Sequence, residues 1–180
     1  MNKVRAACLL VLLLAVSPLL ATNGIAPTNT PDSVQVCFSP NGGCTEVIVG
    51  ELNKAKAEVL AQAYSFTSKE IAKALLDAHK RGVKVQVILD KSNLTEKYSA
   101  ADFVAHAGIP LLIDSEHAIA HNKVMVIDAE TVITGSFNFT KAAEEHNAEN
   151  LLILHDKTLA AKYAANWRDH AAHSTPYPGR

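Results

Sequence analysis

Four side chains that together suit a tetrahedral phosphate fall within eighteen residues of one another. They are an imidazole, an ammonium, a hydroxyl and a carboxamide, and they belong to His121, Lys123, Ser136 and Asn138. An ammonium and neutral hydrogen-bond donors stabilise negative charge on phosphoryl oxygens, and an imidazole can serve as nucleophile or as proton carrier. The set predicts a site that acts on phosphate esters.

The local pattern predicts two short strands joined by a polar turn. Residues 124–127 and 131–134 are rich in β-branched side chains. Because side chains two apart lie on one face of a strand, His121 and Lys123 are expected to point the same way. The same parity places Asp128 on the opposite face, so we expect its carboxylate to fix the turn rather than to touch substrate.

The spacing H-x-K-x4-D-x6-G-S-x-N resembles the signature of the phospholipase D superfamily, whose members cut or transfer phosphodiesters. Residues 62–68, with the helical pattern after them, resemble the first half of its small bacterial nuclease branch. The likeness extends over about residues 34–167. A second H-x-K at His155 lacks the rest of the motif, so the chain holds one copy.

The resemblance implies a role for each motif residue. It implies that His121 attacks phosphorus and that Glu149 accepts a hydrogen bond from this histidine. We assign as catalytic His121, Lys123, Asp128 and Glu149, and as phosphate-binding Lys123, Ser136 and Asn138. Two alternatives stay open: Glu149 as an ordinary solvated carboxylate, and Ser136 and Asn138 as caps of the following turn.

One imidazole cannot be both the in-line nucleophile and the acid behind the leaving group. In similar proteins with a single motif, two chains supply one histidine each. The resemblance therefore implies a homodimer with a composite active site in which two His121 side chains face each other. The two imidazoles would titrate as a coupled pair, one neutral and one charged.

The predicted activity is that of a metal-independent phosphodiesterase without a cofactor, most naturally a non-specific endonuclease acting on DNA or RNA. One alternative is a phospholipase D-type hydrolase of a cardiolipin-like lipid, and another is an inactive phosphate-binding module. His117 and His121 are four apart, a spacing that binds zinc on a helix. The strand-like flanks and the missing glutamate of H-E-x-x-H disfavour a metal there.

Residues 1–21 resemble a secretory signal, with Lys3 and Arg5 before an apolar run at 6–16. The run is shorter than the ~20 residues of a membrane span. We expect a periplasmic or secreted protein without stable membrane association once the signal is cleaved. A retained anchor would favour the lipid hydrolase.

Cleavage would also remove Lys3 and Arg5, leaving 15 basic residues against 18 acidic ones, a formal charge of −3. A groove for a polyanion would then need a local patch of lysines. The lysines available for such a patch are Lys69, Lys73, Lys91, Lys97, Lys123 and Lys141.

After a linker at residues 22–33, residues 34–173 form the expected catalytic domain and 174–180 a C-terminal tail. Cys37 and Cys44 flank a turn-rich loop and are expected to form a disulfide in an oxidising compartment, the alternative being two unpaired thiols.

Short apolar runs alternate with helical patterns along this domain. They predict strands at 33–38, 59–66, 83–89, 111–113 and 150–155, besides the motif hairpin. They predict helices at 46–57, 67–81, 97–106, near 141 and at 157–171. The expected fold is a single α/β domain with a mixed, largely parallel central sheet flanked by helices on both faces, as in phospholipase D-like proteins.

Overall fold

The computed structural model describes residues 33–180, so the predicted signal segment and nearly all of the linker lie outside the described part. The strands are β1 (Val34–Ser39), β2 (Glu58–Ala63), β3 (Lys84–Asp90), β4 (Leu111–Asp114), β5 (Lys123–Ile127), β6 (Thr131–Gly135), β7 (Glu149–His155) and β8 (Thr175–Pro176). The helices are α1 (Cys44–Lys54), α2 (Lys69–Lys80), the 3-10 turn η1 (Lys91–Leu94), α3 (Ala101–His106), α4 (Lys141–Glu145) and α5 (Lys157–His173).

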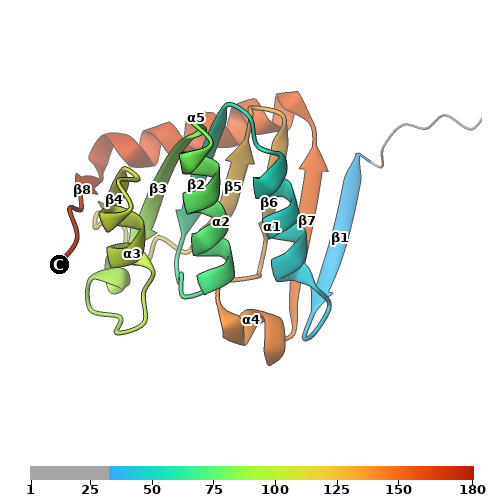
Figure 1. The fold of residues 1–180 in the computed structure, drawn as a ribbon, viewed down its shortest axis with the longest axis horizontal. Coiled ribbons are helices and arrows are strands. Elements are labelled where there is room, and N and C mark those ends of the chain that lie inside the picture. Colours follow the sequence, from blue (N-terminus) through green and yellow to red (C-terminus); the bar gives the residue numbers. More distant parts are fainter. Residues whose placement is uncertain (1–32) are drawn as a thin grey trace, which may run out of the picture. The chain divides into compact units, whose positions relative to one another are not determined.

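The strands form one mixed sheet in the order β1-β7-β6-β5-β2-β3-β4-β8 (Figure 1). Only the β2–β3 and β3–β4 pairs are parallel, and the other five are antiparallel. The expectation of a largely parallel sheet is therefore wrong, although the mixed α/β architecture is confirmed. A three-residue turn between β5 and β6 can join only antiparallel neighbours, whereas α2 and α3 provide the crossovers that parallel strands need.

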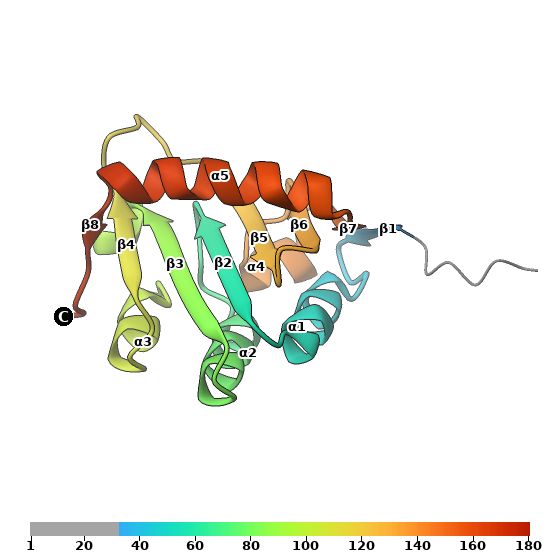
Figure 2. The ribbon, with the colours of Figure 1, turned by 90° about the horizontal axis from the view of Figure 1, so that it is seen from above.

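Helices cover both faces of the sheet. Figure 2 shows α1, α2 and α3 on one face and α5 alone on the other. Leu159, Tyr163 and Trp167, spaced four apart on α5, pack on the sheet, where Trp167 is buried and its indole donates to the Ala61 carbonyl at 2.9 Å. None of the helices within residues 33–180 has the length and apolar character needed to cross a bilayer.

Helices α2 and α3 begin later than the sequence pattern predicts. At α2, Ser68 rather than Thr67 is the cap: its hydroxyl accepts from the Ile71 amide at 3.2 Å and donates to Glu70 at 3.0 Å. At α3, the Ser99 hydroxyl bonds to Asn93 and accepts from the Ala101 amide, so residues 97–100 stay outside the helix.

The predicted disulfide is present between Cys37 on β1 and Cys44 at the start of α1. Both cysteines are buried. The bond ties the edge strand β1 to helix α1, which covers one face of the sheet. Both cysteines are remote in sequence from the H-x-K motif.

The C-terminal residues, expected to be a tail, pack on the domain. Strand β8 pairs with β4, and the Asp102 carboxylate accepts from the Tyr177 hydroxyl at 2.6 Å and from the Arg180 amide at 2.9 Å. The Tyr177 bond first, and the Arg180 bonds next, lower the pKa of Asp102 to about 2.

We expect Asp102→Asn to lower the free energy of unfolding at pH 7 by up to about 1 kcal/mol, because the partners are partly exposed to solvent. Since the folded-state pKa is depressed, this contribution is present above the unfolded value of about 3.9 and is lost as pH falls toward 2. Chemical denaturation from pH 7 to 2 measures it. The exposed Asp169→Asn on α5 is the control. If the free energy of unfolding of Asp102→Asn differs from that of the parent protein by the same amount across this pH range, the lowered pKa of Asp102 is contradicted.

Candidate active site

The structure brings five of the predicted residues together around one pocket of about 350 Å³. Its lining consists of His121, Lys123, Gly135, Ser136, Asn138 and Glu149. These residues lie at the start of β5, the end of β6 and the start of β7. The three strands are antiparallel neighbours, with Val124 opposite Thr134 and Gly135 opposite Leu151, so these ends meet at one edge of the sheet.

Lys123 is the buried cation of the pocket, with 6% of its surface exposed. Its ammonium donates to the His121 carbonyl at 2.9 Å and lies 5.3 Å from the centre of the Tyr64 ring. Burial lowers the pKa of Lys123 below its ordinary value, and the negative charge of Glu149 opposes that shift. The site therefore holds a desolvated positive charge whose remaining N–H donors are available to an anion.

Tyr64 is a site residue that was not predicted. Its ring lies 4.7 Å from the His121 ring, and its amide donates to the Asn122 carbonyl at 2.8 Å. That bond extends the pairing of β2 with β5 past Lys123. The pairing of these two strands, which no local pattern reveals, is what brings Tyr64 to the histidine.

Glu149 is held by two donors, the Ser136 hydroxyl at 2.6 Å and the Asn147 amide at 3.1 Å. Ser136 in turn accepts from the Asn150 backbone amide at 3.0 Å. A hydroxyl carries one proton, so Ser136 cannot donate to a phosphate while it donates to Glu149. Within residues 33–180 the hydrogen bonds to this carboxylate come from Ser136 and Asn147, and the bond from His121 stays a prediction.

Asn138 is directed into the pocket by its two buried neighbours. Phe137 and Phe139 are almost fully buried, and Phe139 packs edge-on against Phe66 with 6.3 Å between ring centres. In the described part of the chain the Asn138 amide oxygen is buried without a hydrogen-bond partner. A buried unpaired polar atom is costly. Because an amide oxygen can only accept, a phosphate would be held by the NH2 group of Asn138.

Steric crowding explains why the first position of the G-S-x-N motif is a glycine. Gly135 has a φ of 152°, and a Cβ at this position would clash with the Asn150 carbonyl. Only glycine lets β6 approach β7 closely enough here for the Ser136 and Phe137 amides to donate to that same carbonyl.

Asp128 is not brought to the pocket. It lies at the opposite end of β5, five residues or roughly 17 Å of strand away from Lys123. Its carboxylate accepts from the backbone amides of Lys56, Ala57 and Glu58 at 2.9, 2.8 and 3.0 Å. Burial raises the pKa of Asp128, but these three bonds outweigh it and hold the pKa below its ordinary value. The prediction that Asp128 is a catalytic residue is therefore wrong, and its position matches the predicted turn-fixing role.

Residues 48–170 match the family described as cardiolipin synthase, PLD-like domain. The chain belongs to the phospholipase D superfamily. It is 46% identical over 139 residues to phospholipase D of Rickettsia conorii, covering 77% of this chain and 70% of the relative. It is 31% identical to mitochondrial cardiolipin hydrolase of Canis lupus familiaris, of which it spans 55%.

Among solved structures the fold matches Nuc from Salmonella typhimurium, a phospholipase D family member. The TM-score is 0.77 at 41% identity, covering 80% of this chain and 97% of Nuc. NucT from Helicobacter pylori, at 23% identity and a TM-score of 0.72, shares the fold. The protein is thus a phosphodiester hydrolase of this superfamily.

We expect Asp128→Ala to reduce the free energy of unfolding by about 1–3 kcal/mol, because three backbone donors lose a charged acceptor. The catalytic rate per folded molecule should remain that of the parent protein. Chemical denaturation and a turnover assay measure both. Glu130→Ala, in the same turn and paired with the exposed Lys157, is the control. A turnover loss as deep as that of His121→Ala, with stability unchanged, would return Asp128 to the chemistry.

Proposed function

We propose that the protein is a metal-independent endonuclease that hydrolyses DNA or RNA through a phosphohistidine on His121. The observation that carries the proposal is the convergence of His121, Lys123 and Asn138 on one pocket with Glu149 at its rim. An imidazole can supply the nucleophile for an in-line displacement at phosphorus, and a desolvated ammonium and a fixed carboxamide can stabilise the charge on the phosphoryl oxygens.

In the first step the neutral His121 imidazole attacks phosphorus, a nitrogen–phosphorus bond forms, and the bond to the leaving oxygen breaks. The second His121, from the sister subunit, gives its proton to that oxygen. In the second step this imidazole takes a proton from water, which attacks phosphorus and releases His121. Lys123 and Asn138 hold the phosphoryl oxygens, each well-placed donor contributing on the order of 3 kcal/mol to the transition state.

Glu149 and Ser136 act on the histidine indirectly in this scheme. In this scheme the Glu149 carboxylate, held by Ser136 and Asn147, accepts a hydrogen bond from one ring nitrogen of His121, and the other ring nitrogen is free to attack. Ser136 then orients Glu149 and binds phosphate only when that bond is released.

Two lysines near the segment of Asn138, one of them paired with Glu145 at 3.3 Å, are available to a nucleic-acid substrate despite the acidic balance of the chain. The Phe139 carbonyl accepts from the Thr67 and Ser68 amides at 3.0 Å, so Lys69 and Lys141 flank the segment that carries Asn138. The Lys141 side chain is 75% exposed. Exposed cations beside the pocket would hold the backbone of a strand without reading its bases.

The lipid alternative is favoured by a different observation. An apolar pocket of about 600 Å³ lies between α2 and α3, and Tyr98 and Phe103 are exposed there. Such a surface suits an acyl chain better than a nucleotide. The phospholipase D and cardiolipin hydrolase names of the relatives point the same way.

Plasmid nicking and release of phosphatidic acid from cardiolipin vesicles, measured side by side on chain lacking residues 1–21, separate the two substrates. We expect nicking that continues in EDTA, because no step uses a metal, and that His121→Ala abolishes. His146→Ala, an exposed histidine at the end of α4, should nick like the parent protein. Lipid release without nicking would replace the nuclease with the lipid hydrolase, and strict dependence on an added divalent ion would overturn the mechanism.

The homodimer is part of the same proposal, and an exposed apolar stripe supports it. Val34, Val36 and Phe38 on the edge strand β1 are 52%, 50% and 65% exposed. The stripe leads toward the pocket, since Ser39 pairs with Glu149 and Phe38 with Asn150. A second copy seated here would cover the stripe and bring its own site close.

If two His121 side chains form one site, parent chains refolded together with His121→Ala chains should lose activity. In an equal mixture we expect about half the activity that the same amount of parent chain shows alone, because a mixed dimer is inactive. His146→Ala chains mixed in the same way should not lower the activity of the parent chains. Activity per parent chain that is independent of the mixing ratio would show that each subunit works alone.

A further inference from the structure

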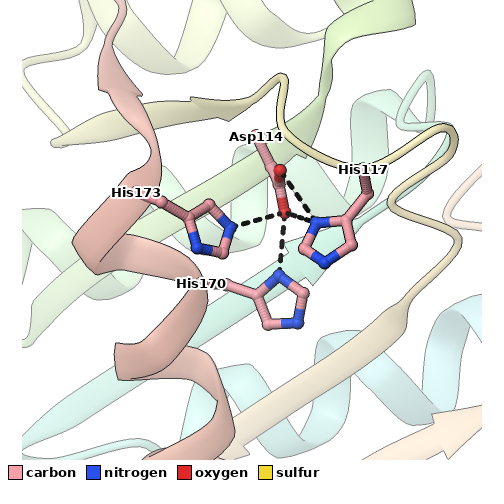
Figure 3. Close-up of side chains that lie close together, drawn as sticks. All are labelled: Asp114, His117, His170 and His173. Carbon is pink, nitrogen blue, oxygen red and sulfur yellow. Dashed lines mark hydrogen bonds and ion pairs between the residues drawn. The ribbon is translucent and has the colours of Figure 1, made fainter.

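A second cluster of polar side chains lies outside the catalytic pocket (Figure 3). It consists of Asp114, His117, His170 and His173. Asp114 ends β4, His117 lies in the loop that leads to His121, and the other two occupy the last turn of α5. None of the four lines the pocket of His121.

The three imidazoles converge on one carboxylate oxygen. Asp114 is fully buried, and its Oδ2 lies 3.0 Å from His117 Nδ1, 2.8 Å from His170 Nδ1 and 3.3 Å from His173 Nε2. The histidine side chains are 45%, 14% and 27% exposed, so the cluster sits below the surface with one ring open to solvent. The ring centres are 4.9 to 5.4 Å apart.

Hydrogen bonding alone does not satisfy this cluster. Asp114 Oδ1 already accepts from the Glu116 amide at 3.2 Å. His173 Nε2, although 3.3 Å from Oδ2, is poorly aligned for a hydrogen bond and is buried without a partner in the described part of the chain. A buried nitrogen aimed at a carboxylate and two other imidazoles points to a ligand that takes all of their lone pairs.

We propose that Asp114, His117, His170 and His173 bind a zinc ion. Three imidazole nitrogens and one carboxylate oxygen match the donors that Zn²⁺ prefers, and four ligands complete its tetrahedral shell. The ligand atoms all lie within 4.8 Å of one another. Around zinc, with bonds of about 2.0–2.1 Å, they would lie roughly 3.3 Å apart, so side-chain shifts of about 1 Å close the site.

The zinc ion joins two segments of the chain that are more than fifty residues apart in sequence. It links β4 and the end of α5 to the loop before His121. The same loop is held by Lys91, which donates to the His117 carbonyl, and by Asp90, which accepts from the Ala120 amide, both at 2.8 Å. The ion thus stabilises the junction of these parts of the fold, and it takes no part in the chemistry.

Zinc content after gel filtration of the full chain, and competition with a coloured zinc chelator, test the site directly. We expect one zinc per chain. His117→Ala and His173→Ala should each weaken binding by more than the 10–100-fold loss that is typical, in rough terms, of an outer-shell change. Removing zinc should lower the unfolding temperature and leave the rate of the folded enzyme unchanged. Cobalt in place of zinc should show the visible absorption of a tetrahedral complex.

Two matched variants make the result specific. His146→Ala, another surface histidine, and His121→Ala, which removes the catalytic imidazole, should both keep the zinc. Loss of zinc in His121→Ala would move the ion to the catalytic pocket. No stoichiometric zinc in the parent protein, or unchanged binding in both His117→Ala and His173→Ala, would overturn the proposal and leave a hydrogen-bonded histidine cluster. Neither result bears on the nuclease assay, which tests the other site.

Discussion

The site depends on one buried charge, the ammonium of Lys123 at the start of the central strand β5. A buried ammonium is costly unless it is paired, and here it is stabilised by the His121 carbonyl, the face of the Tyr64 ring and the field of Glu149. An anion in the pocket would complete this pairing. The same hydrogen bond fixes the backbone of His121, so the cation proposed to attract the phosphate also places the proposed nucleophile.

The antiparallel half of the sheet makes this arrangement possible. Because β5, β6 and β7 run in alternating directions, the start of β5, the end of β6 and the start of β7 lie at one edge. Two constraints fix their register. Asp128 anchors the far end of the hairpin to the start of β2, and Gly135 lets β6 and β7 approach at the near end. Asp128, which lies outside the pocket, therefore determines its geometry together with Gly135, which lines it.

Features encoded over short stretches of sequence could be predicted. His121, Lys123 and Asn138 belong to a single hairpin whose strand period aligns them, and Cys37 and Cys44 flank one loop. The parity of the strand also indicated that Asp128 faces away, although the family motif placed it among the catalytic residues.

Features that depend on distant pairings could not be read in the same way. Tyr64 reaches His121 only because β2 pairs with β5, and the antiparallel character of the sheet follows from such pairings. His117 was weighed with His121, its neighbour in sequence. Its partners are instead His170 and His173, more than fifty residues away, which the fold alone brings to it.

In the proposed mechanism a ring nitrogen of His121 becomes covalently bonded to phosphorus during turnover. The enzyme is mixed with the substrate bis(p-nitrophenyl) phosphate, and the reaction is stopped with alkali within the first turnover. Peptide mass spectrometry then observes that bond directly. We expect a phosphoryl adduct on His121 that is stable in base, labile in acid and absent from His121→Ala. Turnover without any adduct on this residue, or with the adduct on another side chain, would contradict the mechanism.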